Sequence, residues 1–141
     1  MGRPLQDIGL SVKRLQARHH RAIDTALAPL GIGLVQWDAL RQIHAHPGVS
    51  LHDLAQMTFQ TDQSFGALAS RMIARDLIER VPGPGRAARH RLTEKGEALR
   101  QSATTTVEGV LRESFSPLTQ AQLDEFDALL VRLLSPPDAL G

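Results

Sequence analysis

The residues with the clearest chemical potential lie in one basic stretch, "VPGPGRAARHRLTEKG", which spans residues 81–96. The two Pro-Gly pairs predict a short, stiff turn, and the alternation of side chains along a strand places Arg89 and Arg91 on one face and His90 on the other. Arginine binds phosphate and fits a narrow minor groove, because its guanidinium is planar and weakly hydrated. We therefore expect a hairpin that contacts a polyanion, with Arg86 at its tip. The alternative is that these arginines only keep an exposed edge strand from pairing.

The charge distribution along the chain supports a polyanionic partner. The net charge of the whole chain is only +1, but residues 63–95 carry seven Lys and Arg against three Asp and Glu, whereas residues 96–141 carry three against seven. Each contact with a phosphate releases counterions locally, so a local cluster of arginine matters more than the total charge. A polyanion is the partner that we expect for the basic middle, and a solvated surface hairpin is the alternative.

A second set of candidate residues lies on an amphipathic stretch just before the hairpin. Its apolar residues are spaced as one face of a helix that packs on a core: Phe65, Leu68, Ala69, Met72 and Ile73. The residues expected to face outward are small or lightly charged: Gln63, Ser64, Gly66, Ala67, Ser70 and Arg71. Such a face can approach the floor of a major groove, where Gln63 and Ser64 could reach base edges and Ala67 a thymine methyl. The alternative is that Gly66 and Ala67 merely fill surface.

No residue pattern indicates catalysis, a cofactor or a metal. The chain has no cysteine, which excludes disulfides, thiolate chemistry and sulfur-rich zinc sites. None of its six histidines form a pair with i, i+4 ligand spacing, and His44 is explained by the favourable dipole at a helix end. The Pro-Gly-Pro-Gly turn cannot cradle a phosphate, because proline lacks an N–H group. We therefore expect neither an enzyme nor a metal sensor.

The elements that must position these residues follow from periodicity, caps and breakers. Ser50 followed by Asp53 is typical of a helix start, Thr93 is a good N-cap, and Thr119 with Gln122 forms a capping box. Asp62 or Thr61 caps the helix that carries Gln63. Together these signals predict helices over residues 5–30 and about 34–45, a short helix at "LHDLAQM" and a helix that starts at Asp62 and includes Ile73. They also predict a long helix from Thr93 to near Pro117, a last helix after Thr119 that includes Leu123 and Leu133, and a hairpin formed by "LIERV" and "ARHRL".

The predicted fold class is mainly α with a small β-hairpin (α+β). The two short helices around "TFQT" indicate a helix-turn-helix. The first helix and the last two have more apolar surface than such a small unit can cover, so we expect a homodimer. No apolar run approaches membrane-spanning length and no secretory leader is recognisable, so we expect no membrane partner and a cytoplasmic location.

Three segments resemble the MarR-type winged helix-turn-helix transcriptional regulators, and the resemblance covers nearly the whole chain. They are "LVQWDALRQI", "VSLHDLAQMTFQTDQSFGALASRMIARDLIERV" and "RHRLTEKGEAL". The resemblance implies a winged helix-turn-helix over residues 34–96, and N- and C-terminal dimerisation helices within residues 1–33 and 97–141. It also implies that the outward face of the helix that carries Gln63 enters a major groove of double-stranded DNA. The hairpin, or wing, then reaches the neighbouring minor groove or the DNA backbone.

Regulation by a small molecule is a further implication of the resemblance. Many members of this family are repressors released by small, often aromatic, ligands that bind between the dimerisation and DNA-binding regions. Four residues lie on the helices that wall this pocket in the family: His19, His20, Trp37 and Arg41. The resemblance thus implies a ligand-responsive repressor that binds a pseudo-palindromic operator as a homodimer. The alternative is a winged-helix protein-interaction module without sequence-specific DNA binding.

The sequence departs from the family pattern at the wing and at the recognition helix. Pro84 stands where the wing's usual aspartate would be, although Arg86 keeps the following arginine, and the hairpin is about two residues short. Ala67 replaces a common arginine of the recognition helix, and Asp76 stands at the glycine that usually follows that helix. The base preference of the family therefore cannot be transferred to this chain.

Overall fold

The fold is described from a computed structural model, which covers residues 2–83, 85 and 87–136. The order of elements confirms the predicted fold class, with helices before and after a two-stranded antiparallel hairpin. The elements are α1 Leu5–Leu27, the 3-10 turn η1 Ala28–Leu30, α2 Leu34–Ala45, α3 Leu51–Met57, α4 Asp62–Ala74, β1 Ile78–Arg80, β2 His90–Leu92, α5 Glu94–Ser114 and α6 Gln120–Leu134.

Helix starts follow the predicted caps. The hydroxyl of a Ser or Thr just before the helix accepts a hydrogen bond from the backbone N–H three residues further on, and this occurs at Ser50, Thr61, Thr93 and Thr119. Such a bond satisfies one of the backbone donors that a helix start leaves unpaired. Of the two candidates before α4, Thr61 is the cap, and Asp62 is the first helical residue.

The end of the first helix differs from the prediction. The α-helix stops at Leu27, and the predicted last residues, 28–30, form η1 instead. Pro29 has no N–H with which to continue the α-helical hydrogen bonds, so the chain tightens into a 3-10 turn. Gly31 then reverses the chain with a φ of 76°, in the left-handed region that favours glycine.

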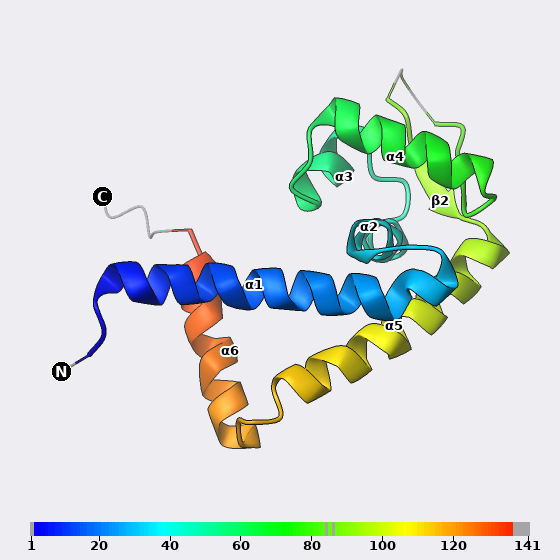
Figure 1. The fold of residues 1–141 in the computed structure, drawn as a ribbon. Helices are drawn as coiled ribbons and strands as arrows, with labels where there is room; N and C mark the ends of the chain where they lie inside the picture. Colours follow the sequence, from blue (N-terminus) through cyan, green and yellow to red (C-terminus); the bar gives the residue numbers. More distant parts are fainter. Residues whose placement is uncertain (1, 84, 86, 137–141) are drawn as a thin grey trace, which may run out of the picture.

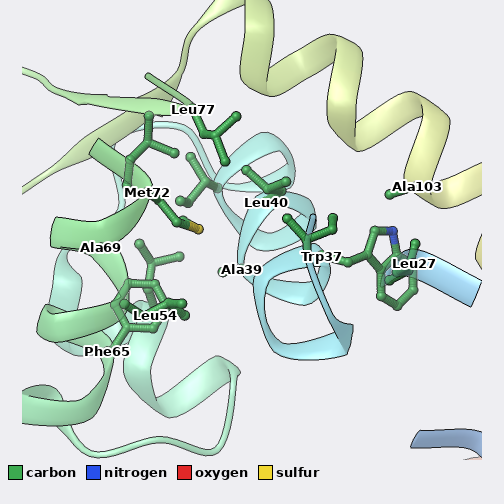
Figure 2. Packing of buried hydrophobic residues seen from close by; sticks show 14 of the residues in the cluster. Leu27, Trp37, Ala39, Leu40, Leu54, Phe65, Ala69, Met72, Leu77 and Ala103 are labelled. Carbon is green, nitrogen blue, oxygen red and sulfur yellow. The ribbon is translucent and has the colours of Figure 1, made fainter. Parts of the chain in front are cut away.

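The core centres on α2 (Figure 2). Leu40 and Ala39 of α2 lie between the helix-turn-helix, represented by Phe65, and the side of α1 and α5, represented by Leu27. In Figure 1, α2 lies between α1 and the pair formed by α3 and α4, which places α4 on the outer side of the molecule. The helix-turn-helix is therefore held from behind by a packed core.

Ile73 was predicted to face this core, and that prediction is wrong. Ile73 is 39% exposed, whereas Met72 beside it is 1% exposed. The chain leaves α4 at Ala74 and brings Leu77, which is fully buried, into the core next to Met72. Leu77, beyond the end of α4, is thus part of the core, and Ile73 lies at its exposed margin.

A close backbone contact fixes the hairpin to α5. A Cβ atom at Gly96 would lie 1.9 Å from the carbonyl oxygen of Leu77, so only glycine fits there. The N–H of Thr93 donates to the same carbonyl at 3.1 Å, and the Thr93 hydroxyl donates to the carbonyl of Asp76 at 2.6 Å. The segment that follows α4 is therefore fastened to the start of α5.

The outer helices bury little of their apolar surface within one chain. In α1 the buried residues are Ile23 and Leu27, and no described residue of α6 is buried. The large apolar side chains that remain exposed on or next to these helices are Leu5, Ile8, Leu10, Val12, Leu118, Leu129, Val131, Leu133 and Leu134. Among the described residues, none of the helices combines the length and the apolar character that a membrane crossing requires.

Candidate nucleic-acid interface

The outer face of α4 carries the predicted contact residues. Gln63, Ser64, Ala67, Ser70 and Arg71 are exposed, and Gly66 is half-buried. The opposite face is anchored by Phe65, Leu68 and Met72, each at most 2% exposed. The core therefore presents a rigid helix with short side chains, several of which can donate or accept hydrogen bonds.

The amino-terminal end of α4 is organised by polar contacts with α3 and the preceding turn. The Nδ1 atom of His52 lies 2.9 Å from both carboxylate oxygens of Asp62. The Ser64 hydroxyl donates to the Gln60 side-chain oxygen at 3.2 Å. Asp62 would otherwise repel a phosphate, and the imidazole gives its carboxylate a partner. No pattern in the sequence indicates this pair, because residues ten apart meet only through the geometry of the turn.

The carboxyl-terminal end of α4 is tied to the rest of the fold by two cationic side chains. The Nη1 atom of Arg75 donates to the carbonyl of Gly31 at 2.8 Å, and Nζ of Lys95 donates to the carbonyl of Arg75 at 3.0 Å. These bonds join α4 to η1 and to α5. Sequence reasoning missed both residues, since they resemble ordinary surface charges.

Two arginines of the hairpin, Arg89 and Arg91, have partners within the protein. Glu79 pairs with Arg91 across the strands, and Arg91 Nε donates to Glu79 Oε1 at 2.7 Å. Arg89 donates to the carbonyl of Gly48, in the loop between α2 and α3. Arg89 thus braces the base of the hairpin, while Arg91 lies on its exposed face. Arg86, the predicted tip, and Pro84 lie outside the described residues.

His90 lies on the opposite face of β2 from Arg91, as the alternation predicts. It is 2% exposed, and burial lowers the pKa of its imidazole, with the charge of Arg80 adding to the shift. Within the described residues its Nδ1 atom has no hydrogen-bond partner. His90 is therefore a neutral packing residue beneath the hairpin.

Two of the predicted effector residues lie on α1 and have different partners. The Nε2 atom of His19 lies 2.7 Å from the Ser114 hydroxyl, and its ring meets Phe115 edge to face at 5.2 Å. His20 instead pairs with Asp24 at 3.3 Å. Burial, followed by the charge of Arg18, lowers the pKa of His19. A cavity of about 610 Å³ between α1 and α5 is lined by Arg18, His19, Ala22, Thr25, Ala26, Val110, Glu113, Ser114 and Pro117.

The other two predicted effector residues lie together on α2. Trp37 is 9% exposed, and its indole N–H donates to the Thr104 hydroxyl at 3.1 Å. The guanidinium carbon of Arg41 lies 4.9 Å from the centre of the Trp37 ring. Neither Trp37 nor Arg41 lines the cavity that His19 borders. Within the described part of the chain, no three His, Asp or Glu side chains are grouped so that they could hold a metal ion.

Comparison with known proteins identifies this arrangement. The sequence model of the MarR family matches residues 30–87, the segment from η1 through the helix-turn-helix into the hairpin. Over this segment the chain is similar to the MarR family. The match falls on the elements that present α4 and the hairpin, which agrees with the resemblance found in the sequence.

Relatives extend the family match over nearly the full length. The HTH-type transcriptional repressor Rv2887 of Mycobacterium tuberculosis is 27% identical over 128 residues, which cover 89% of this chain and 92% of the repressor. Rv2887 in complex with DNA has a TM-score of 0.78 at 27% identity and covers 95% of this chain and 100% of its own. The same protein in complex with salicylic acid has a TM-score of 0.76 at 28% identity, with 94% and 97% covered.

A MarR family regulator from Rhodococcus sp. RHA1 supports the fold alone. Its crystal structure has a TM-score of 0.87 at 22% identity and covers 96% of this chain and 99% of its own. The agreement includes the long outer helices as well as the winged helix-turn-helix, because nearly all of both chains is aligned. The arrangement of α1, α5 and α6 is therefore shared with that crystal structure.

Proposed function

We propose that this chain is a DNA-binding transcriptional repressor of the MarR family that binds a pseudo-palindromic operator as a homodimer and responds to a small ligand. The observation that carries the proposal is the outer face of α4, whose short side chains are exposed while its inner face is fully packed. Rv2887, which has been solved with DNA, shares this fold over nearly its whole length. A rigid helix with such a face can approach base edges in a major groove.

The contact residues divide into two roles under this proposal. The α4 residues Gln63, Ser64, Gly66, Ala67, Ser70 and Arg71 supply sequence choice. In the wing, Arg86 and Arg91 supply affinity through phosphates or the minor groove, and Arg91 is exposed and can exchange Glu79 for a phosphate. Arg89 holds the base of the wing against Gly48.

The dimerisation regions of the proposal are residues 1–33 and 97–141, with the DNA-binding region at 34–96. The exposed apolar side chains of α1 and α6 support this division, because they need a cover that one chain lacks. Two symmetric copies of α4 enter successive major grooves on one face of the duplex. Operator half-sites should then be centred about 10 base pairs apart.

The cavity beside His19 is the place that we propose for the ligand. Its volume of about 610 Å³ can hold a small aromatic acid. Ala22, Ala26, Val110 and Pro117 supply apolar wall, and Arg18 and His19 supply polar groups for the acid, beside Thr25, Glu113 and Ser114. Rv2887 has been solved with salicylic acid. Trp37 is the only tryptophan of the chain, so its fluorescence can report binding nearby. Titration with salicylate, repeated on His19→Ala, separates this cavity from the Trp37 and Arg41 pair.

A gel mobility-shift assay tests the DNA-binding proposal. The probe is the promoter region beside the gene for this chain, and the titration is repeated across a series of salt concentrations. Binding through several phosphates requires affinity to fall steeply as salt rises, and Arg91→Ala should flatten that slope by about one unit. Absence of a mobility shift at low salt would contradict the DNA-binding proposal and favour a protein-interaction module.

A further inference from the structure

The turn between α3 and α4 contains a residue that the fold itself does not explain. Phe59 has a φ of 57°, in the left-handed region that favours glycine, and it is 96% exposed. A bulky residue with this backbone conformation is a genuine outlier. Its ring gains almost nothing from burial within the chain. An outlier of this kind, beside a functional helix, points to a contact made outside the chain.

The surroundings of Phe59 indicate what kind of contact this is. The Gln60 amide donates to the Thr58 hydroxyl at 3.2 Å, and the Gln60 side-chain oxygen accepts from Ser64. Thr61 caps α4 with its hydroxyl. Phe59 is therefore a single apolar ring within a rim of polar groups. A protein partner usually needs a broad apolar patch, whereas a DNA groove presents isolated apolar groups between polar edges and phosphates.

The position of the turn matches that assignment. Phe59 lies three residues before the first residue of α4, and Gln63, a proposed base-contacting residue, lies in the first turn of that helix. In helix-turn-helix proteins the amino-terminal part of the recognition helix is the part that approaches base edges. Figure 1 shows α4 on the outer side of the molecule, separated from α1 by α2.

We propose that Phe59 contacts operator DNA, with its ring packed against an apolar group at the edge of the major groove. The apolar groups available there are a thymine methyl and the carbons of deoxyribose. This inference rests on the proposed function. It adds Phe59, in the turn before α4, to the residues that select the DNA sequence. The mostly short side chains of α4 leave space for this ring at the groove.

The first arm of the test changes the ring and the backbone together. The probe is a duplex selected by the wild-type protein from a random-sequence library. Phe59→Gly removes the ring but suits the left-handed backbone, so the melting temperature should be unchanged or higher. Its DNA affinity should fall roughly 3- to 10-fold, the size of one apolar contact, with an unchanged salt slope because no phosphate contact is lost.

Matched variants separate the ring from the flexibility of the turn. Asp76 is the other described non-glycine residue with positive φ, at 60°, and it follows the opposite end of α4. Asp76→Gly makes the same backbone change and should leave DNA affinity unaltered. Phe59→Asn tolerates the left-handed backbone without a ring and should lose as much affinity as Phe59→Gly. Phe59→Leu should restore most of it.

The second arm distinguishes the two apolar groups of DNA. Deoxyuridine replaces thymine at one position of the duplex at a time, which removes only the methyl group. If one replacement weakens the wild type but not Phe59→Gly, the ring contacts that methyl. If no replacement does so while Phe59→Gly still binds more weakly, the contact is with deoxyribose.

Equal affinity of wild type and Phe59→Gly would overturn the proposal. A wild type that selects no duplex at low salt removes the proposed function, and with it this contact, before any variant is compared.

Discussion

The helix-turn-helix and the outer helices use the same kind of sequence pattern with opposite results. On α4 the apolar stripe is covered, and Leu68 is 2% exposed. On α6 the apolar stripe is left open, and Leu133 is 78% exposed. Both helices begin with a capped turn and both show helical spacing of apolar residues. Helical periodicity therefore identifies a helix face that must be buried. It does not show whether the same chain or a partner chain buries that face.

The strongest test of this contrast makes the same deletion in both regions. Leu68→Ala should lower the free energy of unfolding by about 2–5 kcal/mol at every protein concentration, because it opens a cavity in the core of one chain. Leu133→Ala should cost less than about 0.5 kcal/mol at dilutions where the chain is monomeric. Chemical denaturation over a range of protein concentrations measures both. Equal losses at high dilution would mean that α6 is already covered within one chain.

A charge on the open stripe should act on assembly instead of on the fold. Leu133→Glu would bury an unpaired carboxylate in the proposed dimer interface, so the dimer dissociation constant should rise by roughly 10- to 100-fold. Sedimentation velocity measures this constant, and circular dichroism checks that the helices persist. Ala121→Glu adds the same charge in the first turn of α6 and serves as the control. A wild type that stays monomeric at all concentrations would contradict the expectation.

The fold was predictable from the sequence where local chemistry decides. The caps at Ser50, Thr61, Thr93 and Thr119 fixed four helix starts, because one hydroxyl and one nearby N–H suffice. The exposure of Ile73 was not predicted: it lies at the margin of the apolar stripe, and the fully buried residue that follows Met72 in the core is Leu77, beyond the end of the helix. The apolar spacing within one helix does not show which residue beyond its end joins the core.

The candidate site was predictable only as far as one face of one element. Spacing along α4 separated Gln63 and Ser70 from the core, and the structure exposes both. Strand alternation likewise placed His90 opposite Arg91, but it could not show that Arg91 meets Glu79 or that Arg89 meets Gly48. Those partners depend on strand register and on a loop some forty residues away.

A smaller effect is expected at the side chain that joins the two regions. Arg75→Met keeps the length of the side chain but removes the hydrogen bond from α4 to the carbonyl of Gly31. The loss should be about 0.5–1.5 kcal/mol, the usual net value of one such bond. Hydrogen exchange should show faster opening at the carboxyl-terminal end of α4. Arg71→Met, one turn earlier, is the control, and equal exchange in both variants would show that the bond does not hold the helix.

The smallest effect is expected from the protonation of Glu97 of α5, which should change the free energy of unfolding at acid pH. Arg100 donates to both carboxylate oxygens of Glu97, at 2.6 and 2.8 Å, and His44 of α2 lies 3.1 Å from one of them. The hydrogen bonds from Arg100 are the main cause that lowers the pKa of Glu97 from 4.5 to about 2. Because the folded pKa lies below the unfolded one, the charged form of Glu97, bound mainly by Arg100 of the same helix, stabilises the protein above about pH 4.5, and its contribution disappears as the pH falls towards 2.

Glu97→Gln isolates that contribution. Since the pair is partly exposed and screened by water, wild type should exceed the variant by less than about 1 kcal/mol at pH 6. Urea unfolding of both proteins between pH 6 and pH 2 should show this gap narrowing as Glu97 becomes protonated. Glu108→Gln changes an exposed glutamate of the same helix and should show no such narrowing. A gap for Glu97→Gln that stays constant down to pH 2 would mean that the amide loses packing or hydrogen bonds, and that the charge of Glu97 does not stabilise the fold.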